Sequence, residues 1–190
     1  MGPVDGQIAV VTGASRGIGR GVAIGLGEQG ATVYVTGRSI GDKPRTIDTT
    51  AREVTEAGGK GIAIQTDHFD DTQIEAIFTK VKEEHGHLDI LVNNVFKIPD
   101  PPAWDGGFWE HPVSIWDDQV GIGCRAHYVA SWHAAPLLFE SPKRPIIINI
   151  TSPAGLIYLF SSSYSTGKAA LDRLTHDMAV ELAPKNVTAL

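Results

Sequence analysis

Short, continuous apolar runs recur along this chain, and longer stretches with helical spacing separate them. The predicted strands cover residues 8–13, 31–37, 61–67, 88–94 and 145–152. The predicted helices cover residues 17–30, 46–58, 70–86, 112–140 and 164–183. Continuous apolar runs are typical of strands buried on both faces, and strands that alternate with helices form parallel sheets. We therefore expect one α/β domain over residues 1–190, with a doubly wound parallel sheet.

Two segments fall outside this alternation. Residues 96–112 are broken by Pro and Gly, and the aromatic residues Trp104, Phe108 and Trp109 favour a packed, functional loop. Residues 186–190 resemble the first residues of a further strand. We therefore expect that C-terminal strands of the sheet are missing from this sequence, which would leave the strand at 145–152 with an unpaired edge.

Composition excludes several kinds of partner. The net charge is −6 and Lys and Arg form no run, which argues against nucleic acid or an anionic membrane as a ligand. The single Cys124 excludes an intramolecular disulfide and fits a reducing cytoplasm. No apolar run has the length of a membrane span, and the His residues lack metal-ligand spacing, so we expect neither a membrane segment nor a metal site.

A glycine-rich turn, "TGASRGIG", follows the first predicted strand and precedes the first helix. In this position glycines permit a tight turn, close approach of a diphosphate and close packing of helix on strand, which is typical of a Rossmann-type dinucleotide site. A purely structural turn is the alternative. The expected cofactor contacts in this turn are Gly13, Ser15, Arg16, Gly17, Ile18 and Gly19.

The end of the second predicted strand indicates which dinucleotide binds. Sites for NAD usually place an acid there, whereas an Arg suits the 2′-phosphate of NADP. Here the strand ends with Gly37 and Arg38, and Arg16 could reach the same region. We therefore expect NADP(H) to be preferred, with NAD(H) as the alternative. Asp67, which closes the third strand, either accepts from the adenine amino group or caps the helix that follows.

Tyr164 and Lys168 are four residues apart at the start of the last predicted helix, so they share one helix face. A free tyrosine titrates near pH ~10, too high for efficient proton transfer near neutrality, and a neighbouring cation lowers that value. The pair therefore indicates a tyrosine tuned for acid–base chemistry. A solvated helix face is the alternative reading.

Four motifs in this order and spacing, "TGASRGIG", Asn93-Asn94, "TSPAG" and Y-x-x-x-K, resemble the short-chain dehydrogenase/reductase family. The resemblance implies an NADPH-dependent oxidoreductase that interconverts a carbonyl and an alcohol. It implies that Tyr164 is the catalytic acid/base, that Lys168 tunes it and binds ribose, and that Ser152 hydrogen-bonds the substrate oxygen. It further implies that Asn93 supports the fourth strand beside the cofactor, and that the protein is a homodimer or homotetramer.

Three departures from the family pattern stand out. Phe96 replaces a glycine close to the cofactor, and Ser152 and Tyr164 are one residue closer in sequence than usual. Gly123 stands where the family has an asparagine that supports a water-borne proton relay to the lysine. Either bulk water replaces that relay or His127, one turn further on, assists; a packed histidine is the simpler reading.

Two functions remain open at this stage. One is the enzyme, for which the intact Ser152, Tyr164 and Lys168 argue. The other is a non-catalytic NADP(H)-binding sensor or scaffold on the same fold. The aromatic loop favours an apolar small-molecule substrate, or a contact between subunits.

Overall fold

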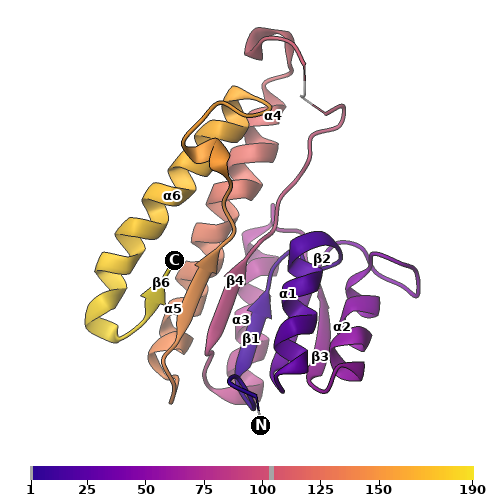
Figure 1. The fold of residues 1–190 in the computed structure, drawn as a ribbon, viewed down its shortest axis with the longest axis vertical. Coiled ribbons are helices and arrows are strands. Elements are labelled where there is room, and N and C mark those ends of the chain that lie inside the picture. Colours follow the sequence, from indigo (N-terminus) through magenta and orange to yellow (C-terminus); the bar gives the residue numbers. More distant parts are fainter. Residues whose placement is uncertain (1, 103–104) are drawn as a thin grey trace.

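The fold was obtained as a computed structural model, which describes residues 2–102 and 105–190 (Figure 1). Its strands are β1 (Ile8–Val11), β2 (Thr32–Gly37), β3 (Lys60–Gln65), β4 (Ile90–Asn93), β5 (Ile146–Asn149) and β6 (Thr188–Ala189). Its α-helices are α1 (Gly17–Glu28), α2 (Ile47–Glu56), α3 (Asp71–His85), α4 (Ser114–Trp116), α5 (Ala126–Phe139) and α6 (Ser162–Leu182). A π-helix, η2 (Asp117–Arg125), joins α4 to α5, and short 3₁₀ turns occur at η1 (Phe108–Glu110), η3 (Pro153–Gly155) and η4 (Ala183–Lys185).

The strands form one parallel sheet in the order β3-β2-β1-β4-β5-β6, which confirms the doubly wound, Rossmann-type architecture. The order reverses between β1 and β4, and the carboxyl ends of all strands meet at one edge. Because the connections leaving β1 and β4 diverge at this point, a crevice opens there in doubly wound sheets. The segments after β1, β2, β4 and β5 all lie along that edge (Figure 1).

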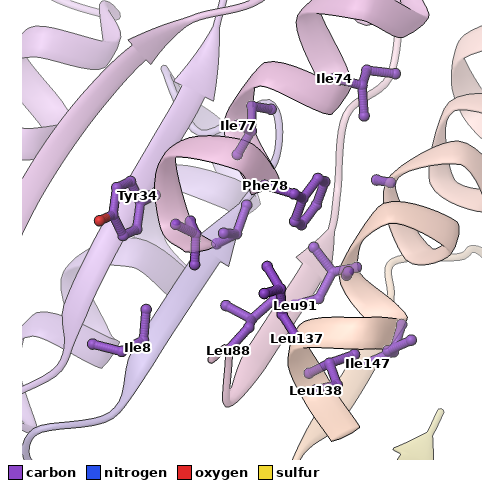
Figure 2. Close-up of a cluster of buried hydrophobic side chains, with 14 of the residues drawn as sticks. Ile8, Tyr34, Ile74, Ile77, Phe78, Leu88, Leu91, Leu137, Leu138 and Ile147 are labelled. Carbon is purple, nitrogen blue, oxygen red and sulfur yellow. The ribbon is translucent and has the colours of Figure 1, made fainter. Parts of the chain in front are cut away.

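Helices cover both faces of the sheet. Alternate residues of each apolar run pack toward opposite faces. Ile8 and Val10 of β1 belong to the core cluster under α3 and α5. Figure 2 shows Ile8 in this cluster with two other members, Leu91 and Ile147. Ala9 and Val11 belong to the opposite cluster, under α1 and α2. Successive side chains of a strand point to opposite faces, so a continuous apolar run satisfies both layers.

The long helix predicted over 112–140 is present as α4, η2 and α5, with a π-helical middle section. π-helical turns are rare and occur mostly as single-turn bulges, frequently at functional sites. The η2 segment packs against α6, where the Gly167 Cβ position would lie 3.2 Å from the Gln119 carbonyl oxygen. Gln119 is buried and accepts a hydrogen bond of 2.8 Å from the Ser161 hydroxyl. The helix predicted from residue 164 begins at Ser162.

The end of the chain confirms one expectation and corrects another: residues 186–190 contain a further strand, β6, but the edge of β5 is not left unpaired. β6 pairs in parallel with β5, with Thr188 opposite Ile146, and the amide of Asn149 donates to the Leu190 carbonyl at 2.8 Å. The β5 edge is therefore paired and not open. Asn186 adopts a left-handed conformation, with φ of 59°, and turns the chain from α6 back to the sheet.

The aromatic loop contains the 3₁₀ turn η1, so it is less irregular than its sequence predicts. Phe108 and Trp109 are exposed, at 71% and 73%. Trp104 lies outside the described residues. Within the part of the chain that the structure describes, no helix has the length and apolar character required to cross a bilayer.

Candidate active site

The glycine turn leaves β1 and enters α1 through two left-handed residues. Gly13 and Gly17 have φ values of 64° and 59°, which glycine adopts without strain. A Cβ at Gly13 would lie 2.6 Å from the Val95 Cα, and a Cβ at Gly19 would lie 2.3 Å from the Asn94 Nδ2. Gly13 and Gly19 therefore allow the turn to pack directly on the segment that follows β4.

Asn94 ties these two segments together. Its Nδ2 donates to the carbonyl oxygens of Thr12 and Gly13, both at 3.0 Å. The Thr12 hydroxyl in turn accepts from the amides of Asn94 and Val95, at 2.9 and 3.1 Å. The Asn93-Asn94 pair can be recognised in the sequence, but the role of Asn94 cannot. The only sequence signal that distinguishes the two residues is that Asn93 ends an apolar strand and Asn94 follows it.

The start of α1 has no side-chain cap, unlike the starts of α2, α3 and α6. Arg16 occupies the N-cap without a capping hydrogen bond, and the first turn carries no acid. By contrast, Thr46, Asp70 and Ser161 cap α2, α3 and α6. The amides that begin a helix need acceptors, and an anion can supply them. The N-terminus of α1, which has no side-chain cap among the described residues and lies beside the glycine turn, therefore fits a diphosphate.

A cavity of about 250 Å³ lies at the carboxyl edge of the sheet, beside this turn. Gly13, Ser15 and Arg16 line it from the turn, and Arg38 lines it from the end of β2. Both Arg side chains belong to exposed residues, and neither forms an ion pair with another residue in the described ranges. Ile18, at the start of α1, is 62% exposed.

Asp67 also lines the cavity, after β3. Its carboxylate accepts from the Phe69 amide at 3.1 Å, whereas the α3 cap is Asp70, which accepts from the Thr72 amide at 2.9 Å. The capping alternative for Asp67 is therefore wrong. Next to it, His68 is buried and lies 3.0 Å from the Thr36 hydroxyl.

Tyr164 and Lys168 share one face of α6. The Ser161 hydroxyl accepts from the Tyr164 amide at 3.2 Å, which places the tyrosine in the first helical turn. Lys168 is only 6% exposed; its Nζ donates to the Ile150 carbonyl at 2.9 Å and lies 6.0 Å from the Tyr164 ring centroid. Burial lowers the pKa of Lys168, and the nearby Asp172 carboxylate opposes that effect.

Ser152 lies just past β5, at the start of the 3₁₀ turn η3, where its hydroxyl accepts from the Ala154 amide at 3.0 Å. The η3 turn packs closely on α6, since a Cβ at Gly155 would lie 2.0 Å from the Asp172 Oδ2. Close packing of η3 on the tyrosine-bearing helix holds Ser152 at the same edge as Tyr164. The shortened connection between them is therefore compatible with this arrangement.

Asn93 is buried in a polar ladder beneath the site. Its Nδ2 donates to Asn149 Oδ1 at 2.9 Å and to the Ser131 hydroxyl at 3.0 Å. Asn149 donates in turn to the Thr175 hydroxyl at 2.9 Å. This ladder joins β4 and β5 to α5 and α6. Asn93 thus supports the sheet beside the cavity without lining it.

His127 is fully packed beside the same strand. It is 1% exposed, and its Nε2 lies 2.9 Å from the Val95 carbonyl oxygen, which makes this nitrogen the donor. Burial lowers the pKa of His127 to about 3. This is the geometry of a packed histidine, whose ring anchors the backbone after β4.

A reversing parallel sheet, an uncapped glycine turn and a Tyr–Lys pair at one edge define a dinucleotide-binding dehydrogenase class. The chain belongs to the short-chain dehydrogenase family, whose model matches residues 7–190. Dehydrogenase/reductase SDR family member 1 of Mus musculus is 41% identical over 191 residues, and its Homo sapiens counterpart is 39% identical. Residues 108–118, 152–160 and 164–170 already indicate this likeness in the sequence. Each alignment covers 99% of this chain and 59% of the relative, so the chain spans about three fifths of their length.

Solved structures agree with this assignment. A metagenomic short-chain oxidoreductase crystallised in complex with NADP superimposes with a TM-score of 0.85 and is 34% identical. The superposition covers 97% of this chain and 80% of that structure.

Proposed function

We propose that this chain is the NAD(P)-binding domain of an NADPH-dependent oxidoreductase that interconverts a carbonyl and an alcohol. The observation that carries the proposal is the pairing of Tyr164 with the buried Lys168 ammonium at the edge of the sheet that also holds the glycine-turn cavity. A protein that only binds the cofactor has no need for a phenol beside a desolvated cation.

The cofactor site fits NADP(H). Gly13, Gly17 and the uncapped start of α1 suit the diphosphate, and a Cβ at Gly17 would contact nothing within 4 Å. Arg16 and Arg38, with no acid at the end of β2, suit a 2′-phosphate through charge-assisted hydrogen bonds. The NADP complex of the metagenomic relative supports this choice. Asp67 is proposed to bind the adenine.

When bound, the nicotinamide supplies hydride to a carbonyl carbon or accepts it from an alcohol carbon. Tyr164 is proposed to give its hydroxyl proton to the carbonyl oxygen during reduction, and to take it back during oxidation. The Lys168 ammonium stabilises the phenolate that this transfer leaves. Ser152 donates a hydrogen bond to the same substrate oxygen as negative charge develops there.

The proposed substrate is a small carbonyl compound or alcohol of apolar character, because Phe108 and Trp109 present exposed aromatic surface near this end of the molecule. Trp132 and Phe139 of α5 are also exposed, at 63% and 41%, and we propose that α5 contributes to a homodimer or homotetramer. A cytoplasmic location is proposed from the single, half-buried Cys124.

The direct test measures binding and turnover separately on the full-length protein. NADPH binding is followed by cofactor fluorescence, and turnover by the decay of that fluorescence with a panel of ketones, aldehydes and quinones. We expect saturable binding and turnover of at least one apolar carbonyl compound. Tight binding with no turnover across the panel in either direction would favour the sensor or scaffold function.

A further inference from the structure

Two of the departures from the family pattern meet in space. The Phe96 ring lies against the backbone of Gly123 on the π-helix η2: a Cβ at Gly123 would lie 3.2 Å from Phe96 Cδ2 and 3.5 Å from Cε2. A larger side chain at position 123 would therefore need the space that the ring occupies. The Phe96 ring therefore occupies the space that the absence of a side chain at Gly123 leaves.

The same ring contacts both members of the Tyr–Lys pair. Its centroid lies 5.3 Å from that of Tyr164, with the two planes at 71°, an edge-to-face contact. The Lys168 Nζ lies 5.5 Å from the Phe96 centroid, within the range of a cation–π interaction. Phe96 also lines the cavity beside the glycine turn. It therefore connects the cavity to the proposed catalytic residues.

The backbone around Phe96 is anchored on both sides. On one side the Val95 carbonyl oxygen accepts from His127 at 2.9 Å. On the other side the Lys97 ammonium donates to Asp118 Oδ1 at 2.6 Å and lies 5.2 Å from the Phe69 ring centroid. A side chain between two such anchors has little freedom to leave its position.

We propose that Phe96 is a positioning residue that holds the Lys168 ammonium and the Tyr164 ring through one aromatic side chain, in the space that Gly123 leaves open. This proposal rests on the proposed function, in which Lys168 and Tyr164 carry the proton transfer. The face of the ring stabilises the charged form of a lysine that burial disfavours. The edge-to-face contact between the two rings restricts the orientation of the phenol.

Other groups also influence the Lys168 charge, and the test has to hold them constant. Tyr164 and Asp172 are on its own helix, Cys124 is on η2, and His127 is on α5. None of the variants below changes these residues. A change in Lys168 titration between variants then reports on the ring.

The experiment measures acylation of Lys168 by acetic anhydride as a function of pH, in the full-length protein without added cofactor, with the Lys168 peptide quantified by mass spectrometry. The plateau rate reports access to the amine, and the midpoint of the pH profile reports its pKa. Phe96→Leu removes the aromatic face but keeps most of the volume. We expect it to lower the midpoint by about half a pH unit, which is about threefold more free amine at neutral pH.

Two controls separate an aromatic effect from loss of packing. Phe96→Tyr keeps the ring and is expected to keep the midpoint of the unmutated protein. Phe69→Leu removes the ring beside the other ammonium, Lys97, and is expected to leave the Lys168 midpoint unchanged. A Phe96→Leu protein whose plateau changes while its midpoint does not would show a merely space-filling ring and overturn the proposal.

Gly123→Ala tests the second half of the proposal. The added methyl presses on the ring, so it is expected to lower the Lys168 midpoint in the presence of Phe96 and to have no further effect in the Phe96→Leu protein. Equal effects in both backgrounds would contradict the coupling. Because acylation needs no turnover, these results stand apart from the test of the proposed function, which fails if the unmutated protein reduces no carbonyl compound.

Discussion

Lys168 carries an ammonium group in a position where water reaches little of it, and the Ile150 carbonyl, the Phe96 ring and the Tyr164 ring surround it. Desolvation of a cation is costly, so a site that keeps one must use its charge or compensate it. Here the contacts to the carbonyl oxygen and the ring compensate part of the cost. The remaining partner is the Tyr164 phenol, the proton donor of the proposed reaction.

The first prediction concerns the phenol itself. Tyr164→Phe is expected to lower kcat by about a hundredfold or more, because it removes the proton donor, while NADPH affinity stays within a few-fold. Lys168→Ala is expected to lower kcat and also to weaken NADPH binding. Steady-state kinetics and cofactor titration check this, with the exposed Tyr128→Phe as the matched control. Near-full activity in the Tyr164→Phe protein would end the proposed mechanism.

The second prediction concerns the choice of cofactor. Arg38→Ala is expected to reduce the preference for NADPH over NADH by about tenfold, because one charge-assisted hydrogen bond to the 2′-phosphate is lost. Salt should weaken NADPH binding more than NADH binding in the unmutated protein, since the extra contact is exposed and ionic. Arg173→Ala, which removes an exposed Arg paired with Asp177, is the control. An unchanged affinity ratio would place Arg38 outside the phosphate site.

Among the elements, α1 provides a matched pair of glycines. Gly19→Ala puts a methyl 2.3 Å from the Asn94 side chain, so the hydrogen bonds from Asn94 to the glycine turn must shift. A Cβ at Gly21, by contrast, meets nothing within 4 Å. We expect Gly19→Ala to destabilise the protein by about 1–3 kcal/mol and to weaken NADPH binding. Gly21→Ala should stabilise it by about 0.5–1 kcal/mol through helix propensity. Urea unfolding and cofactor titration on both variants measure the difference; equal effects would show that the Asn94 contact is unimportant.

The order and type of the elements could be predicted because each depends on local pattern. The apolar run at 8–13 predicts a strand from its own composition, and β1 occupies Ile8–Val11 of that run. The glycines of the turn that follows can be read directly from the sequence. The contact of Phe96 with Gly123 could not be predicted, since it joins residues 27 positions apart in two segments with no shared periodicity. The π-helical winding of Asp117–Arg125 depends on its packing against α6, which no local pattern contains. The pairing of β6 with β5 likewise depends on where α6 ends.

At the scale of the whole molecule, the segment after β4 is held by side chains from three other parts of the chain: His127 of α5, Asp118 of η2 and Thr12, which follows β1. His127 of α5 bonds the Val95 carbonyl oxygen, and His68, beside the cavity, lies against Thr36 of β2. Both imidazoles are almost fully buried, and for both the Nδ1 atom has no hydrogen-bond partner among the described residues. Burial lowers the pKa of His127 to about 3 and that of His68 to about 4.

These two values predict how stability depends on pH. In the unfolded chain both histidines titrate near pH ~6.5, so between that pH and about 4 the unfolded state binds protons that the folded state does not. Their contribution to stability is complete above the unfolded pKa and is lost as the pH falls. The free energy of unfolding should therefore fall by about 1–3 kcal/mol per pH unit between pH 6 and pH 5. Protonation of carboxylates changes stability at lower pH, near their pKa values of about 4 in the unfolded chain.

Urea unfolding at pH 7, 6 and 5 tests this dependence. His127→Gln keeps an amide that can donate to the Val95 carbonyl oxygen but does not titrate, so it should remove about half of the slope. His176→Gln, at a side chain that is 69% exposed, should leave the slope unchanged. A slope that His127→Gln does not change would show that this histidine is charged or solvated in the folded protein, and that Val95 is held by other contacts.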